Sequence, residues 1–173
     1  MSTNTMSKTN SYLSFRIDEE VYAAHVSKVV SILELTKIMK IPRSKEYIRG
    51  VINLRGSVLP IVDVKIKFGL EPTEFTANTC ILVLEIQMED KLAKIGALVD
   101  SVEEVLEIDE ADVLAPPSLG KNYRAEFIDG MYKLDNSFIM LLNMESIFSS
   151  DEISFMSSEM LFDEEPKMIE KDK

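Results

Sequence analysis

The chain has 173 residues, of which 46% are hydrophobic, and a formal net charge of −11. This length suits one domain or two small lobes, and this composition suits a folded protein. The negative charge argues against nucleic acid as a partner, because a nucleic-acid binder needs a basic surface, and against docking on anionic lipid. No apolar run approaches the ~20 residues of a transmembrane helix, and residues 1–10 lack the apolar core of a signal peptide. We therefore expect a cytoplasmic protein.

The chain has one Cys and one His. An internal disulfide needs two cysteines, and a histidine metal site needs more ligands than this chain offers. The only His also lacks a nucleophile motif around a serine. We expect no metal, no cofactor and no catalytic residue.

The first predicted element is a hairpin, preceded by a disordered arm over residues 1–11. Residues 12–17 alternate apolar and polar side chains, as a half-buried strand does, and 21–24 return after an acidic turn. Val26, Val29 and Ile32 then recur at helical spacing, which favours a short helix or turn.

A second hairpin is predicted later in the chain. Residues 81–86 form a continuous apolar run rich in β-branched side chains, which is typical of a strand buried on both faces. Residues 91–99 run back, with Gly96 as the expected position of a bulge. Many short strands separated by turns favour small barrels or a sandwich.

Two stretches of the sequence repeat. Residues 50–68, GVINLRGSVLPIVDVKIKF, align without a gap with residues 130–148, GMYKLDNSFIMLLNMESIF. In this alignment Asp63 meets Asn143, and both residue types suit the N-cap of a short helix. Residues 26–35 likewise match 99–108 in the pattern V-x-x-V-x-x-[IV]-L-E-[LI]. The chain reads as two copies of one plan: hairpin, short turn, linker, hairpin, short helix.

The fold class is therefore mainly β, with two related lobes at about 12–70 and 79–148 and short helices. An exchange of the first strands between the lobes remains open. Residues 149–173 lie outside both copies. Within them we expect a C-terminal helix over 151–162 that packs back onto a lobe through Ile153, Met156 and Met160, followed by a solvated acidic tail.

At one turn, the repeat also distinguishes a residue that the backbone requires from a residue that it does not require. Gly56 meets Asn136, and both residue types tolerate the left-handed conformation that a type I turn with a G1 bulge requires. Arg55 meets Asp135, so the turn requires neither charge. A cation at this hairpin tip of an acidic protein points to a functional role for Arg55.

Residues 47–70, YIRGVINLRGSVLPIVDVKIKFGL, resemble the signature of the CheW family, the coupling proteins of bacterial chemotaxis. Residues 95–108, IGALVDSVEEVLEI, and 121–148 are similar to the family as well, so the resemblance covers about 12–148. It implies two tandem SH3-like five-stranded β-barrel lobes that share a hydrophobic core. It also implies a non-catalytic adaptor that links chemoreceptor cytoplasmic tips to the regulatory domain of the histidine kinase CheA.

The resemblance further implies association with membrane-bound receptor arrays and contacts with other CheW-like domains in rings. It implies a coupling surface that includes Arg55, Val29, Ser31, Ile32, Gly50, Asn53 and Val99. The family often has Glu where this chain has Ser31, which indicates either a changed partner preference or a substitute role for Glu34.

Two other functions stay open from the sequence. The same domain occurs as a regulatory module in related signalling pathways, and a small β-barrel can hold a ligand. A pull-down with receptor fragments and the kinase separates the adaptor from both.

Overall fold

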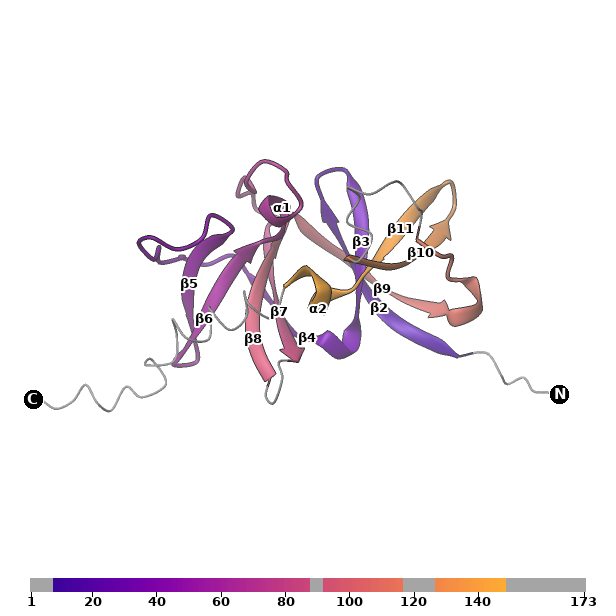
Figure 1. Cartoon of the computed structure of the whole chain (residues 1–173), viewed down its shortest axis with the longest axis horizontal. Coiled ribbons are helices and arrows are strands. Elements are labelled where there is room, and N and C mark those ends of the chain that lie inside the picture. Colours follow the sequence, from indigo (N-terminus) through magenta and orange to yellow (C-terminus); the bar gives the residue numbers. More distant parts are fainter. Residues whose placement is uncertain (1–7, 88–91, 117–126, 149–173) are drawn as a thin grey trace, which may run out of the picture.

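A computed structural model describes residues 8–87, 92–116 and 127–148 (Figure 1). The described strands form two five-stranded sheets, ordered β10-β11-β3-β2-β9 and β4-β7-β8-β6-β5. The strands are β2 (Thr9–Ile17), β3 (Glu20–His25), β4 (Val29–Glu34), β5 (Ile48–Leu54), β6 (Ser57–Asp63), β7 (Cys80–Gln87), β8 (Leu92–Val99), β9 (Ser101–Asp109), β10 (Ile128–Leu134) and β11 (Ser137–Leu142). The helical turns are η1 (Val26–Lys28), α1 (Val64–Lys67), η2 (Glu110–Asp112) and α2 (Met144–Ile147).

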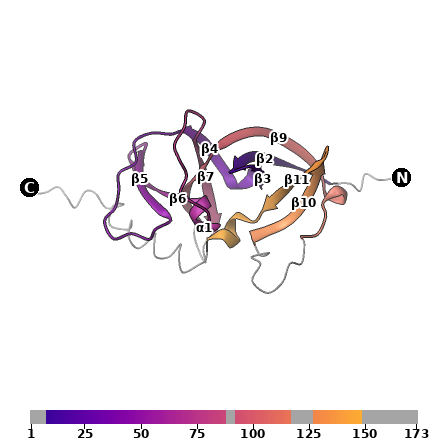
Figure 2. The same cartoon turned by 90° about the horizontal axis from the view of Figure 1, so that it is seen from above.

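The two sheets define two lobes that lie side by side (Figure 2). We call the lobe built from β4, β5, β6, β7 and β8 the middle lobe, because its strands are consecutive in the chain. The terminal lobe combines β2 and β3 with β9, β10 and β11. The mainly β fold with two five-stranded lobes is thus confirmed.

The predicted lobe boundaries, 12–70 and 79–148, do not match the sheets. Strand β11 pairs in parallel with β3, and β6 pairs in parallel with β8, so the first hairpin of each copy completes the sheet of the other copy. The two copies have exchanged their first hairpins, which is the alternative that the sequence left open. Strand β2 also begins at Thr9, so residues 9–11 are strand rather than disordered arm.

One local prediction is confirmed in part and one was wrong. The segment expected as a short helix or turn begins with the 3₁₀ helix η1, but Val29 and Ile32 lie on β4, which alternates half-buried and exposed side chains. Gly96 is not a bulge, because β7 and β8 pair in unbroken register, with Gly96 opposite Val83. A Cβ on Gly96 would lie 2.7 Å from Ile61 Cδ1, so a glycine is needed there for close packing.

The repeat seen in the sequence is present in three dimensions. The Asp63 amide donates to Tyr47 O at 2.7 Å, and the aligned Asn143 amide donates to Phe127 O at 2.8 Å. Each copy also has an isolated bridge from its linker to its hairpin, Met39 with Val51 and Leu114 with Met131. The carboxyl side chain of Asp63 caps α1 and the amide side chain of Asn143 caps α2, as predicted.

The hydrophobic core has three parts, one inside each lobe and one between them. The interlobe cluster is built mainly from the exchanged hairpins and the two short helices, and includes Phe15, Leu84, Val99, Met144 and Phe148, all at most 3% exposed. The predicted shared hydrophobic core is therefore confirmed. The predicted helix over 151–162 and the tail after it lie outside the described residues.

Candidate functional site

The tip of the β5–β6 hairpin is a two-residue turn. Leu54 pairs with Ser57, so only Arg55 and Gly56 form the loop, with φ angles of 54° and 86°. Two positive φ angles are what a type I′ turn requires, so the predicted type I turn with a G1 bulge is wrong. The side chain of Asn53 holds this turn, because its Oδ1 accepts the Gly56 amide proton at 2.7 Å.

The aligned tip of the β10–β11 hairpin uses a different residue for the left-handed position. Asp135 has a φ of 57°, whereas Asn136 is not among the described non-glycine residues with positive φ. The prediction that Asn136 matches Gly56 in backbone conformation is therefore wrong. The left-handed residue that both tips share is the first of the loop, Arg55 in one copy and Asp135 in the other.

Arg55 occupies a backbone conformation that Asp tolerates better. Left-handed positions are enriched in Asn and Asp and cost other side chains on the order of 1 kcal/mol. The Arg55 side chain is exposed, and within the described residues it has no ion pair or hydrogen bond. Beside it lies the apolar Val58, 37% exposed, as Phe138 lies at the second tip. Fold stability does not account for a cation here.

A second candidate surface is the outer face of β4. This strand ends its sheet and pairs only with β7 among the described strands. A bulge lies between Val29 and Ser31, and the side chains of Val30 and Ile32 are 47% and 46% exposed. The sequence did not single out Val30, although its place between predicted surface residues was a usable signal.

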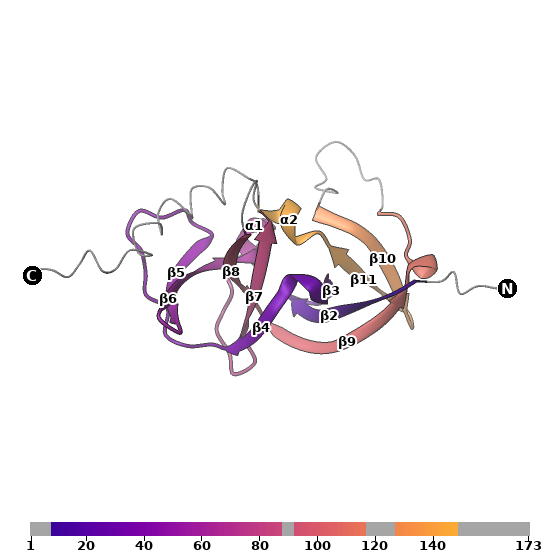
Figure 3. The same ribbon diagram turned by 90° about the horizontal axis from the view of Figure 1, so that it is seen from below.

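The equivalent strand of the other copy is acidic. Strand β9 ends the other sheet, on the same side of the molecule as β4 (Figure 3). The repeat alignment places Glu103 where β4 has Val30, and Glu103 pairs with Arg16 at 3.1 Å. The fold thus accepts a charge at this position, so the apolar Val30 is not required by the fold.

The predicted site residues do not all share one surface. Arg55 and Ile32 are exposed, but Arg55 lies in the β5–β6 turn and Ile32 lies on β4, which pairs with β7 and not with β5 or β6. Ser31 and Val29 are half-buried on the inward face of β4, where Val29 packs against the shared core. Their assignment to a coupling surface stays a prediction for these four positions.

Two of the predicted coupling residues are buried, and a third has a structural role although it is exposed. Val99 is 1% exposed and belongs to the shared core. Gly50 is buried with a φ of 141°, and a Cβ there would overlap the carbonyl oxygen of Met39. Asn53 is exposed, but its side chain holds the turn through Gly56.

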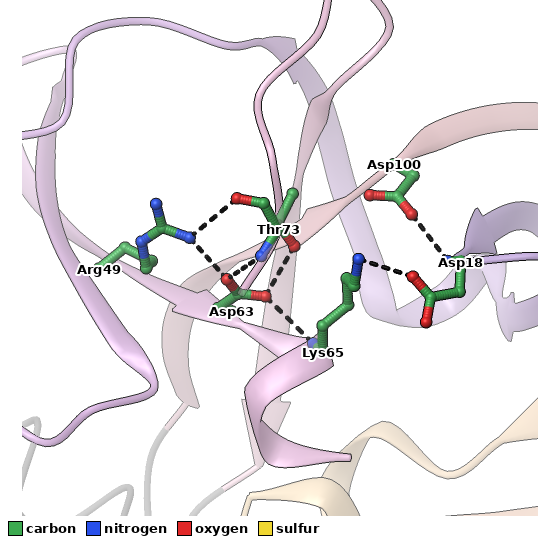
Figure 4. Close-up of polar contacts among 6 residues, drawn as sticks. All are labelled: Asp18, Arg49, Asp63, Lys65, Thr73 and Asp100. Carbon is green, nitrogen blue, oxygen red and sulfur yellow. Dashed lines mark hydrogen bonds and ion pairs between the residues drawn. The ribbon is translucent and has the colours of Figure 1, made fainter. Parts of the chain in front are cut away.

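A buried polar cluster supports the hairpin base (Figure 4). The Asp63 carboxylate is 0% exposed and accepts from Arg49 Nη1 at 2.7 Å, from Thr73 N at 2.9 Å and from Thr73 Oγ1 at 2.8 Å. Lys65, the second residue of α1, pairs with Asp18 at 2.6 Å. That contact raises the pKa of Lys65 and joins α1, beside the middle lobe, to the tip of the β2–β3 hairpin in the terminal lobe.

The second short helix makes the matching contact with opposite charge. Glu145 aligns with Lys65 in the repeat, and its carboxylate accepts from Lys28 Nζ at 2.7 Å and from Gln87 N at 3.2 Å. The hydrogen bond from Lys28 holds the pKa of Glu145 below its usual value. Each short helix therefore contacts the exchanged hairpin of its own copy, α1 through Asp18 of the β2–β3 tip and α2 through Gln87 of β7, so the two lobes are held together at two places.

The described residues contain no group of three His, Cys, Asp or Glu side chains arranged to hold a metal ion. None of the helices within 8–87, 92–116 and 127–148 has the length and apolar character needed to span a membrane.

The sequence matches a family model described as a CheW-like domain over residues 11–152. The chain belongs to the CheW family. A chemotaxis protein CheW of Rhizobium meliloti is 30% identical over 140 residues, covering 81% of this chain and 88% of that protein. The chemotaxis protein CheW of Thermotoga maritima is 30% identical over 138 residues, with 78% and 85% covered.

A solved structure in the CheW family has the same architecture. The scaffolding protein TtCheW from Thermoanaerobacter tengcongensis superposes with a TM-score of 0.73 at 30% identity. The match covers 84% of this chain and 96% of TtCheW. The CheW-like domain therefore accounts for both lobes, and the family assignment made from residues 47–70 and 95–108 is confirmed.

Proposed function

We propose that this protein is a non-catalytic adaptor that couples the cytoplasmic tips of chemoreceptors to the regulatory domain of the histidine kinase CheA. Membership of the CheW family supports this, as do relatives named as chemotaxis proteins and a structural relative named as a scaffolding protein. In this proposal the protein works at membrane-bound receptor arrays and also meets other CheW-like domains in rings.

The observation that carries the proposal is the hairpin tip at Arg55. The backbone there favours Asp, the aligned turn has Asp135, and yet this copy presents an exposed cation beside Val58. A side chain that the fold does not need, at a conformation that disfavours it, is explained by a contact outside the molecule. We assign one partner contact to this tip.

An adaptor needs a second contact, and the outer face of β4 offers one. Val30 and Ile32 expose apolar area on a strand that ends its sheet. Its counterpart β9 has the exposed carboxylates of Glu103 and Glu104 at the aligned region. Because the two surfaces belong to the same lobe, a partner held at one lies at a fixed distance from a partner held at the other.

In this proposal the protein catalyses no reaction, and its mechanism is to couple the binding free energies of its two partners. An adaptor changes kinase output when its contacts differ in free energy between the states of its partners. The shared core and the two clasps, Lys65 with Asp18 and Glu145 with Gln87 and Lys28, tie the lobes into one body. A displacement of one partner is then passed on to the other.

Co-sedimentation of the full chain with receptor cytoplasmic fragments and CheA tests the proposal. We expect the protein to sediment with each partner alone and to increase the amount of kinase that sediments with receptor. A folded protein that sediments with neither partner contradicts the adaptor function.

A further inference from the structure

The linker before β5 is a basic segment in an acidic protein. Residues 36–47, which we call the basic linker, contain Lys37, Lys40, Arg43 and Lys45 against a single acidic residue, whereas the whole chain has a net charge of −11. All four cationic side chains are exposed. Within the described part of the chain, none of them forms an ion pair.

The basic linker is an ordered platform. Leu35 and Ile38 pack against the core of the middle lobe, and Met39 exchanges two backbone hydrogen bonds with Val51, each of 2.8 Å. The side chain of Met39 nevertheless points outward and is 68% exposed. The surface therefore combines a protruding apolar side chain with cations on both sides.

The second copy shows that the fold does not need these cations. Its linker makes the equivalent bridge through Leu114, which is 49% exposed. The described residues next to that bridge include Glu110 and Asp112 and no basic residue. Within the described residues, the apolar protrusion is common to both linkers, whereas the basic side chains lie in the first linker alone; Lys121 and Arg124 of the second linker lie outside the described residues.

The described chain ends beside this surface. Lys67 Nζ lies 4.5 Å from the ring centroid of Tyr47, the last residue of the basic linker, and 5.9 Å from that of Phe148. Residues 149–173 continue from Phe148 and contain eight acidic and three basic residues. Their apolar residues include Ile153, Phe155, Met156 and Met160.

We propose that the C-terminal segment 149–173 docks on the basic linker, with its carboxylates facing Lys37, Lys40, Arg43 and Lys45 and its apolar side chains covering Met39. The charges are complementary, and each side supplies apolar area. The segment has ample reach, because 25 residues span up to about 80 Å when extended.

The same chain, rather than a second copy, is the favoured occupant. The segment is tethered next to the linker, which gives an effective concentration in the millimolar range for a short flexible connection. The acidic strand β9 of a second copy would have to compete with this tethered segment for the basic linker, at micromolar protein concentration. Docking is thus intramolecular and independent of protein concentration.

Paramagnetic relaxation in the full chain tests this contact. Cys80→Ser removes the native thiol, and Ser158→Cys then carries a nitroxide in the C-terminal segment. We expect the amide signals of residues 37–45 to broaden in the ¹⁵N-labelled chain when it is diluted with unlabelled chain. Broadening should disappear at about 1 M salt, where the screening length falls to about 3 Å.

Matched charge reversals assign the contact. Lys37→Glu, Lys40→Glu and Lys45→Glu together should abolish the broadening. The control reverses Lys8, Lys94 and Lys133 to Glu, which are exposed lysines elsewhere, and should preserve it. Unbroadened linker amides overturn the proposal. So does broadening that survives the linker reversal, or that arises only between a nitroxide-labelled chain and a separate ¹⁵N-labelled chain, since the occupant is then a second copy.

Discussion

At the scale of single residues, Arg55 shows how a repeat can separate two roles in one turn. Both hairpin tips place the first loop residue in the left-handed region, Arg55 at 54° and Asp135 at 57°. The second copy fills that position with a residue that suits it, and the first does not. The position of the turn and the left-handed conformation of Gly56 were predictable, but the same conformation was wrongly assigned to Asn136, and that of Arg55 was missed, because glycine identity does not reveal the φ of its neighbour.

Arg55→Gly should stabilise the protein. A glycine adopts positive φ without the steric cost that Arg bears there, so we expect the free energy of unfolding to rise by about 0.5–1 kcal/mol. Urea unfolding of the full chain measures this. A loss of stability of similar size would show that the Arg55 side chain makes a stabilising contact.

The burial of two predicted coupling residues also has a residue-scale explanation. Val99 and Gly50 lie in segments similar to the CheW family, but resemblance alone does not distinguish a contact residue from a buried one. Burial of Val99 in the shared core depends on the opposite lobe, which no local pattern reveals. The signal for Gly50 was present, since the repeat pairs it with Gly130, and both glycines lie against their linkers.

At the scale of elements, the two copies place different pairs of polar side chains at the same two backbone positions. In the first copy Arg49 pairs with the buried Asp63. In the second copy the aligned residues are Asp129 and Asn143, and Asn143 Nδ2 donates to Asp129 Oδ1 at 3.2 Å. One geometry thus accepts an ion pair or a hydrogen bond between a carboxylate and an amide.

A double-mutant cycle exploits this equivalence. Arg49→Asp alone leaves two carboxylates together and should lower the free energy of unfolding by about 3–5 kcal/mol. Adding Asp63→Asn copies the second repeat, and we expect it to restore at least about 1 kcal/mol of that loss. Urea unfolding of the four proteins gives the coupling. If the two single variants lowered the free energy of unfolding additively, the two copies would differ in more than these side chains.

The clasp at α2 predicts a pH dependence. Because Lys28 lowers the pKa of Glu145 in the folded state, its ionised form stabilises the fold above the usual carboxyl pKa. This contribution is lost as the pH falls through the lowered pKa. Glu145→Gln should therefore reduce the free energy of unfolding at neutral pH but cause a smaller reduction at about pH 3.

Urea midpoints across this pH range provide the measurement, with Glu74→Gln as a control on an exposed carboxylate. The Glu145 side chain is 35% exposed, so the effect should be modest and weakened by salt. If Glu145→Gln reduced the free energy of unfolding equally at both pH values, Glu145 would act through its shape and not through its charge.

Element type was predictable where the hydrophobic pattern is long. The buried strand β7 and the two hairpin turns follow from apolar runs and turn residues. The short helix or turn expected after His25 is present as η1, but strand β4 behind it was missed. Val29 and Ile32 of β4 continue the helical spacing of Val26 by coincidence, and the register of β4 shifts between Val29 and Ser31.

At the scale of the whole molecule, the exchange of hairpins makes one body of two repeats. Hairpin β2–β3 belongs to the first copy but completes the terminal lobe, and hairpin β7–β8 belongs to the second copy but completes the middle lobe. The sequence could not decide this, because both copies carry the same hairpin pattern and either partner satisfies it locally. The pairing of β11 with β3 and of β6 with β8 distinguishes the two arrangements.

The exchange predicts that the first copy cannot fold alone. A fragment of residues 1–78 contains β2–β6 but lacks β7 and β8, which complete the middle sheet, and β9 and β11, which pair with β2 and β3. We expect no cooperative unfolding transition for this fragment by circular dichroism, in contrast to the full chain. A cooperative transition would show that the first copy forms a closed lobe of its own.

The affinity of the full chain for receptor cytoplasmic fragments and for the CheA regulatory domain, compared between Arg55→Asp and Asp135→Arg, tests the central claim most directly. Arg55→Asp copies the second turn, so we expect its free energy of unfolding to stay within about 0.5 kcal/mol of the parent chain. Affinity for one of the two partners should fall about tenfold or more, which corresponds to about 1.4 kcal/mol, whereas Asp135→Arg should leave that affinity unchanged. Unchanged affinity of Arg55→Asp for both partners would contradict the assignment of Arg55 to the coupling surface.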